Sequence, residues 1–208
     1  MPHNVNLDAL IHREDFEVMG EPPSASKLAQ GFRVSDLAEG ALTLALLRKP
    51  DFQRETNNWS PRKVADLIKS FLEGDLIPAV ILWRSDKSGN FFVVDGAHRL
   101  SALIAWALDD YGDGKLSRVF FDNHIPPEQN KAAEETRKLV NKEVGSYQEL
   151  SLALRYLDTT PTSKSLSENS ESLRGRHGIS FHADPQSLYH RSFGRPMALD
   201  RRLLSCAA

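Results

Sequence analysis

Residues 93–100 read VVDGAHRL: two β-branched residues, an Asp-Gly pair, a His-Arg pair, and then an apolar pattern with helical spacing. This order is typical of a buried strand, a glycine turn and a new helix N-terminus, an arrangement that can hold a phosphate. Gly96 and the amides near Ala97 and His98 would face the anion, and Arg99 would add a forked, permanently charged donor. The stretch therefore predicts a phosphate-binding turn.

Two further side chains of this turn suit chemistry. His98 can move a proton near neutral pH, and Asp95 can bind a metal ion, orient water or cap the following helix. An alternative needs no ligand, because Asp-Gly between a strand and a helix is ordinary turn chemistry, with Asp95 as the N-cap and Arg99 in solvent. The turn alone leaves both interpretations open.

A second stretch, PDFQRETNNW at residues 50–59, places Gln53 and Arg54 in a loop between a predicted strand and a predicted helix. Arg54 and Arg99 would clamp a polyphosphate from two sides, and Gln53 would position a water molecule. The alternative is a surface ion pair of Arg54 with Glu55 or another acid. Two arginine-bearing loops together favour the phosphate site.

The elements that must position these loops follow from apolar spacing, capping residues and glycine breaks. The sequence predicts, in order, a short helix and a strand before residue 50, a helix from Ser60-Pro61 to Gly74, strands at 79–83 and 91–94 joined by a polar turn, a helix after the DGAHR turn, an irregular stretch at 115–130, a charged helix at 131–144, and a helix after Ser146. This pattern predicts an α/β fold with a small mixed sheet and flanking helices.

Composition limits the class of protein. The net charge of −2 requires that any nucleic-acid contact come from a local patch, and the single cysteine, Cys206, excludes an internal disulfide framework and a four-cysteine zinc site. No metal ligands are assigned. No apolar run suits a signal peptide or a membrane span, so we expect a cytoplasmic protein without membrane contact. Composition also predicts a polar N-terminal arm at 1–30, a main domain at 31–157, and a Ser-rich linker with a basic tail at 158–208.

The ordered motifs PDFQR, a tryptophan, VADLIKSFLEGDLIPAVILW and VVDGAHRLSALIAW resemble the N-terminal domain of GmrSD-type modification-dependent restriction enzymes, a branch of the ParB/sulfiredoxin-like fold. The resemblance covers about residues 35–110. It implies nucleotide binding and hydrolysis that control DNA cleavage, with the Gln-Arg motif at Gln53 and Arg54 and the second motif at Asp95, Gly96 and Arg99.

The sequence departs from the family pattern where restriction enzymes of this type have two glutamines, because Ala97 and His98 stand there. Hydrolysis is thus less directly implied than binding. Ala97 also replaces the nucleophilic cysteine of sulfiredoxins, so their reductase chemistry is not expected. The stretch DNHIP around His124 is similar to the start of an HNH nuclease motif, but a loop role for His124 is preferred and no nuclease centre is expected.

Together these observations predict a ParB/sulfiredoxin-like module that binds GTP, ATP or CTP with Mg²⁺ in a phage-defence restriction system. Asp95, His98 and Gln53 are the candidate catalytic residues, and Arg54, Gly96, Ala97 and Arg99 are the candidate nucleotide-binding residues. DNA is the expected partner, directly or through a nuclease, and homo-oligomerisation stays open. The alternatives are a DNA-binding or adaptor protein that uses nucleotide only as a switch, and a truncated family member without catalysis.

Overall fold

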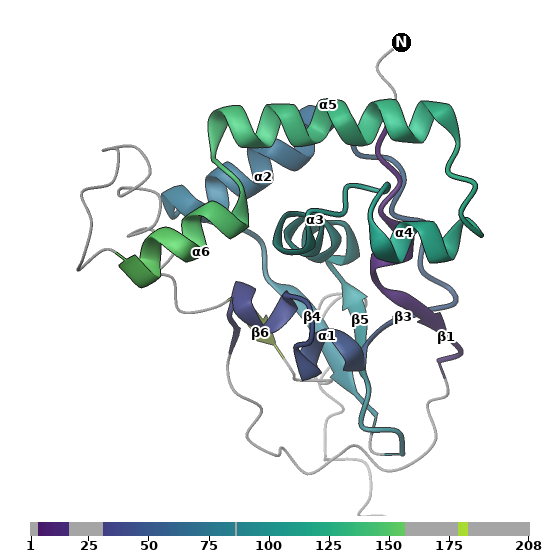
Figure 1. Ribbon diagram of the computed structural model, residues 1–208. Helices are drawn as coiled ribbons and strands as arrows, with labels where there is room; N and C mark the ends of the chain where they lie inside the picture. The colour runs from purple at the N-terminus through teal and green to yellow at the C-terminus, as the bar shows by residue number, and fades with distance from the viewer. Residues whose placement is uncertain (1–3, 17–30, 86, 157–178, 183–208) are drawn as a thin grey trace, which may run out of the picture.

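A single mixed sheet forms the centre of the protein in the computed structural model, which describes residues 4–16, 31–85, 87–156 and 179–182. Its six strands run in the order β1-β3-β5-β4-β6-β2. The strands are β1 (His12–Glu14), β2 (Gly31–Phe32), β3 (Leu47–Pro50), β4 (Val80–Arg84), β5 (Phe91–Asp95) and β6 (Ile179–His182). Helices flank the sheet (Figure 1), which confirms the predicted α/β class.

The described helices are the 3-10 helices η1 (Asp8–Leu10) and η2 (Val34–Leu37), then α1 (Leu42–Leu46), α2 (Pro61–Glu73), α3 (Ala97–Leu108), α4 (Lys115–Phe120), α5 (Pro127–Glu143) and α6 (Tyr147–Tyr156). Helix α2 confirms the local signals: the Ser60 hydroxyl accepts the Lys63 amide at 3.4 Å, and Gly74 ends the helix at φ +89°. α2 then packs along α5.

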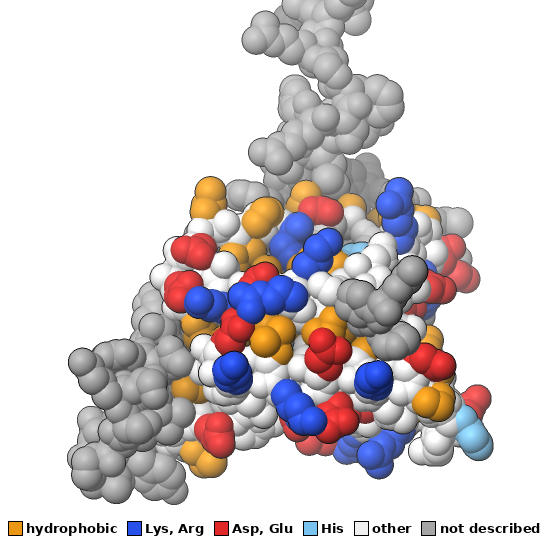
Figure 2. Space-filling model, turned by 90° about the horizontal axis from the view of Figure 1, so that it is seen from above, with side chains coloured by type: hydrophobic (Ala, Val, Ile, Leu, Met, Phe, Trp, Pro, Cys, Tyr) orange, Lys and Arg blue, Asp and Glu red, His pale blue; other side chains and the backbone are white. Residues whose placement is uncertain are grey.

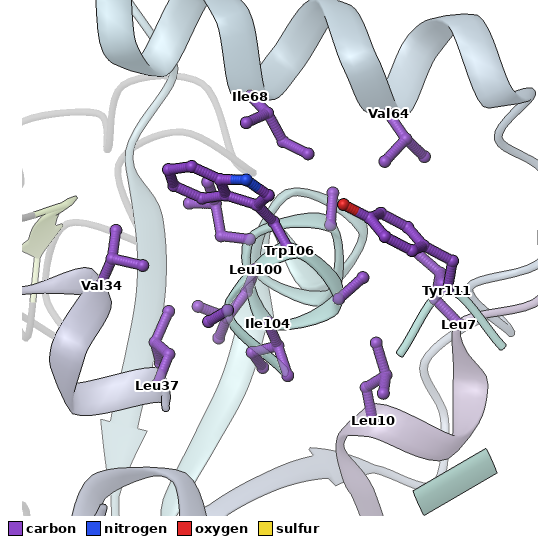
Figure 3. Close-up of a cluster of buried hydrophobic side chains, with 14 of the residues drawn as sticks. Leu7, Leu10, Val34, Leu37, Val64, Ile68, Leu100, Ile104, Trp106 and Tyr111 are labelled. Carbon is purple, nitrogen blue, oxygen red and sulfur yellow. The ribbon is translucent and has the colours of Figure 1, made fainter. Parts of the chain in front are cut away.

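Helix α3 is the central helix of the fold and lies between the strands and the pair formed by α2 and α5 (Figure 1). Nine of its twelve residues are buried, because neighbouring elements cover it on several sides. Side chains from η1, η2, α2 and α3 converge around it (Figure 3), including Leu10, Leu37, Ile68, Ile104 and Trp106. Burial of this cluster fixes the direction of α3 and hence the position of its N-terminus.

Two helical features differ from the expectation. Residues 115–130, predicted as irregular, contain α4, and α5 begins at Pro127 rather than near residue 131. The buried Asp110 carboxylate accepts the amides of Leu116 and Ser117 and the Ser117 hydroxyl, so it organises the start of α4. Leu116, Val119 and Phe120 are partly or largely exposed, which explains why α4 lacks a core-facing apolar pattern in the sequence.

Two described segments outside the predicted main domain also contribute to the fold. Residues 4–16, predicted to belong to a polar N-terminal arm, pack into the fold: Val5, Leu7 and Ile11 are core residues, and β1 pairs in parallel with β3. β6, which belongs to the segment predicted as linker and tail, pairs in parallel with β4. The proposed domain boundaries themselves stay a prediction, and most of 158–208 lies outside the described residues.

Candidate functional site

The two sequence motifs lie at the carboxyl ends of two neighbouring strands, and so on the same side of the sheet. β3 and β5 are neighbouring parallel strands with Leu47 opposite Phe91 and Arg48 opposite Phe92. The Gln-Arg loop begins directly after β3 and the DGAHR turn directly after β5, so both follow the carboxyl ends of adjacent strands. In α/β sheets this is the edge at which ligands commonly bind. The topology therefore joins two motifs that lie about forty residues apart.

The Gln-Arg loop, residues 51–59, is attached to the end of β5. The side-chain amide of Gln53 donates to the carbonyl oxygen of Val94, the residue before Asp95. Arg54 follows Gln53 and is exposed, and it forms no ion pair within the described part of the chain. The predicted alternative of an Arg54–Glu55 pair is not seen among the described residues, where Glu55 accepts the side-chain amide of Asn57 at 2.6 Å. The loop that carries Arg54 is therefore attached to the end of β5 through Gln53.

The DGAHR turn is held by Gly96 and Arg99. Gly96 has φ +92°, and a Cβ added there would lie 2.9 Å from Val80 Cγ2 and 3.0 Å from an Arg99 guanidinium nitrogen. The same Arg99 nitrogen donates to Asp95 at 2.9 Å and to the Ala79 carbonyl at 3.1 Å. The second interpretation of the turn is thus wrong on two points: Asp95 does not cap α3, and only 21% of the Arg99 side chain is exposed.

The N-terminus of α3 accordingly has no side-chain cap among the described residues. Its first amides, those of Ala97 and His98, lack the acceptor that a capping side chain would supply. Helix N-termini of this kind carry partial positive charge and favour an anion. The contribution of the amides at Ala97 and His98 to anion binding stays a prediction.

His98 lies in the first turn of α3 and stacks on Trp59 from the end of the Gln-Arg loop, with ring centroids 5.7 Å apart and planes 25° apart. Its Nε2 atom is buried and has no hydrogen-bond partner among the described residues. Burial lowers the pKa of His98 below its ordinary 6.5, and the positive charges of Lys49, Arg99 and Lys63 act in the same direction against Asp8. Burial and the three neighbouring cations thus favour the neutral form of the His98 imidazole.

A buried ion pair lies below the loops, and the sequence did not reveal it. Lys49 is completely buried and its ammonium donates to Asp8, which also accepts the backbone amide of Thr56 at 2.9 Å and the Thr56 hydroxyl at 3.3 Å. Burial opposes the charge of Asp8, but the bonds from Lys49 and Thr56 and the charges of Lys49 and Arg13 prevail and lower its pKa. Burial also lowers the pKa of Lys49 despite Asp8.

The described residues contain no group of three or more histidine, cysteine or acidic side chains that could hold a metal ion. His124, predicted as a loop residue, is exposed after α4, where its Nδ1 lies 2.7 Å from the Asp122 carbonyl oxygen. In the described part of the chain, no helix has the length and apolar character that crossing a membrane requires.

On the face crossed by α5, basic and acidic side chains are interspersed (Figure 2). Arg62 pairs with Asp66 and Glu143, and Arg137 pairs with Asp109 and Asp113. These two arginines are matched by acids, whereas Arg54 pairs with no acid in the described part of the chain.

Comparison with known families agrees with these motifs. The model of the GmrSD restriction endonuclease N-terminal domain matches residues 34–188, which include both motifs, β6 and about three quarters of the chain. No curated protein and no solved structure matches the chain, so the ParB/sulfiredoxin-like assignment stays a prediction. The family match links the protein to restriction systems that act on DNA. The chain belongs to the family of the GmrSD restriction endonuclease N-terminal domain.

Proposed function

We propose that this protein is the nucleotide-binding module of a restriction and phage-defence system that acts on DNA. The observation that carries the proposal is the meeting of the Gln-Arg loop and the DGAHR turn at the carboxyl ends of two adjacent parallel strands, beside the uncapped N-terminus of α3. GTP, ATP or CTP would be the ligand.

The phosphates would lie at the start of α3. The amides of Ala97 and His98 and the positive end of the helix attract an anion there, and Gly96 supplies the backbone conformation that the turn needs. Arg54 is exposed and unpaired among the described residues, so it can close on the ligand without losing an ion pair. Arg99, already held by Asp95 and Ala79, would supply a fixed positive charge.

The three candidate catalytic residues differ in the contacts that their side chains make without a ligand. The lowered pKa of His98 favours its neutral form, which can accept a proton, and the protonated form would bind a phosphate oxygen. Asp95 is the carboxylate nearest the turn but is paired with Arg99, and the Gln53 amide is bonded to Val94. The bond to Val94 uses one N–H of the Gln53 amide, so the second N–H and the amide oxygen are the groups that would position water. Because Asp95 is engaged by Arg99, we place nucleotide binding ahead of hydrolysis.

Mg²⁺ fits this site only as a companion of the nucleotide. It usually takes one or two carboxylates, substrate phosphates and water, and the single carboxylate of Asp95 suits that pattern better than a site made of protein ligands alone. Asp95 is 63% exposed, so the metal with its water shell can reach it.

Calorimetric titration with GTP, ATP and CTP, with and without Mg²⁺, tests the proposal on the full chain. Arg54→Ala should weaken binding about tenfold or more, because charge-assisted hydrogen bonds to phosphate contribute ~1.5–3 kcal/mol each. Arg84→Ala is the matched control, since Arg84 is an exposed arginine on β4 at the opposite end of the sheet, beside Phe91. No binding of any nucleotide by the wild type, or equal losses in both variants, would refute the proposal.

The alternative of a switch without catalysis is separated by a phosphate-release assay on the same samples. Tight binding without release favours a DNA-binding or adaptor role, in which nucleotide selects a conformation. Release that requires the Asp95 and His98 side chains favours an NTPase. In either case DNA would be reached directly or through a nuclease partner, and the assay should be repeated with DNA present.

A further inference from the structure

The N-terminal segment is the principal support of the Gln-Arg loop. Its backbone runs beside the loop: the Val5 amide donates to the Trp59 carbonyl at 2.8 Å, and the Leu7 amide donates to the Thr56 carbonyl at 2.9 Å. The family match begins only at residue 34, so this support comes from outside the matched region.

Arg13 and Asp8, two charged residues of the same segment, form hydrogen bonds to the Gln-Arg loop. One guanidinium nitrogen of Arg13 donates to the carbonyl oxygens of Asp51 and Gln53, at 3.1 and 2.9 Å, while its Nε donates to Asp8 at 3.3 Å. Asp8 in turn accepts the amide and hydroxyl of Thr56. The backbone is therefore held on both sides of Arg54, at residue 53 and at residue 56.

From these contacts we propose that Arg13 and Asp8 are positioning residues for the nucleotide: they hold the Gln-Arg loop in the conformation that presents Arg54 to the phosphates. The inference rests on the proposed function. Arg54 makes no ion pair among the described residues, so the direction of its side chain depends on the backbone that carries it. If the loop did not hold Arg54 in this position, its side chain would have to be ordered when the ligand binds. The entropy lost in that step would weaken the binding of the nucleotide.

Hydrogen exchange of the full chain without nucleotide tests the structural half of the inference. In Arg13→Ala the amide of Thr56, buried and bonded to Asp8, should exchange about tenfold faster or more, whereas amides in α2 should keep their rates. Arg118→Ala is the matched control. Arg118 lies on α4, away from the Gln-Arg loop in the sequence, and its side chain also donates to a loop carbonyl, that of Asp113, at 3.2 Å. Unchanged exchange at Thr56 would overturn the inference.

A double-mutant cycle on nucleotide affinity tests the functional half. Arg13→Ala should weaken binding about tenfold in the wild type but less than about twofold in the Arg54→Ala background. The reason is that Arg13 affects the nucleotide only through the contact that Arg54 makes with it. Equal losses in both backgrounds would overturn the positioning role. If Arg13→Ala does not fold, Arg13→Lys replaces it, since lysine keeps the charge beside Asp8 but lacks the fork.

The cycle and the exchange experiment separate two kinds of failure. If the wild type binds no nucleotide, the proposed function fails, and Thr56 exchange alone then decides whether Arg13 orders the loop. If the wild type binds and Arg13→Ala binds equally well, the positioning role fails while the proposed function stands.

Discussion

Replacement of Gly96 by alanine should destabilise the protein through two separate effects. The residue has φ +92°, which an L-residue adopts at a cost of roughly 1–2 kcal/mol. The new Cβ would also lie 2.9 Å from Val80 Cγ2, 3.0 Å from the Arg99 guanidinium and 3.2 Å from Val80 Cα, and forcing such groups apart costs typically about 1–3 kcal/mol. The expected loss in the free energy of unfolding is therefore about 2–5 kcal/mol.

Gly89→Ala isolates the first effect. Gly89 lies in the β4–β5 turn at φ +74°, and an added Cβ would meet no atom within 4 Å. Urea unfolding should place Gly96→Ala about 1–3 kcal/mol below Gly89→Ala, a difference in Tm of roughly 2–12 °C for a chain of this size. Equal stability of the two variants would refute the packing of the turn against β4.

Three further predictions concern the charged groups and the loop. Asp8→Asn leaves Lys49 buried without its counter-charge and should cost about 3–5 kcal/mol in urea unfolding at pH 7. Because folding lowers the pKa of Asp8, the ionised carboxylate stabilises the fold fully above about pH 4, and this stabilisation is lost as the pH falls through the folded-state pKa. If the stability of the wild type did not fall toward that of Asp8→Asn at low pH, the Asp8–Lys49 ion pair would be contradicted. NMR titration of His98 should give a pKa below 6.5 that rises when nucleotide binds, since phosphate stabilises the imidazolium; an unchanged pKa in the complex would argue against contact. Gln53→Ala should speed exchange in the Gln-Arg loop, whose attachment to Val94 it removes, and wild-type exchange rates would speak against that attachment.

Local signals in the sequence predicted the elements that carry the motifs. Ser60-Pro61 and Gly74 mark the two ends of α2 because a capping hydroxyl, a fixed proline φ and a left-handed glycine act within a few residues. The polar turn between two apolar runs likewise marks the β4–β5 hairpin. These features depend on near neighbours, which a sequence shows directly.

Contacts between distant segments could not be predicted in the same way. Asp8 lies 41 residues from Lys49 and 48 from Thr56, and a single aspartate in a polar segment gives no sign of its partners. Lys49 gave no local signal either, because β3 has the sequence LRKP and its lysine is buried only once β3 pairs between β1 and β5. Likewise, the sequence alone does not show that the Trp59 ring stacks on His98.

Amide NMR of the full chain, titrated with GTP, ATP and CTP in Mg²⁺ and with inorganic tripolyphosphate, tests the central claim most directly. An anion bound at the start of α3 should shift the amides of Gly96, Ala97 and His98 together with that of Arg54, and leave Arg84 unshifted. Saturable shifts confined to these loops are the predicted result. Shifts that avoid both motifs, or none with any of the four ligands, would contradict a phosphate site between the Gln-Arg loop and the DGAHR turn.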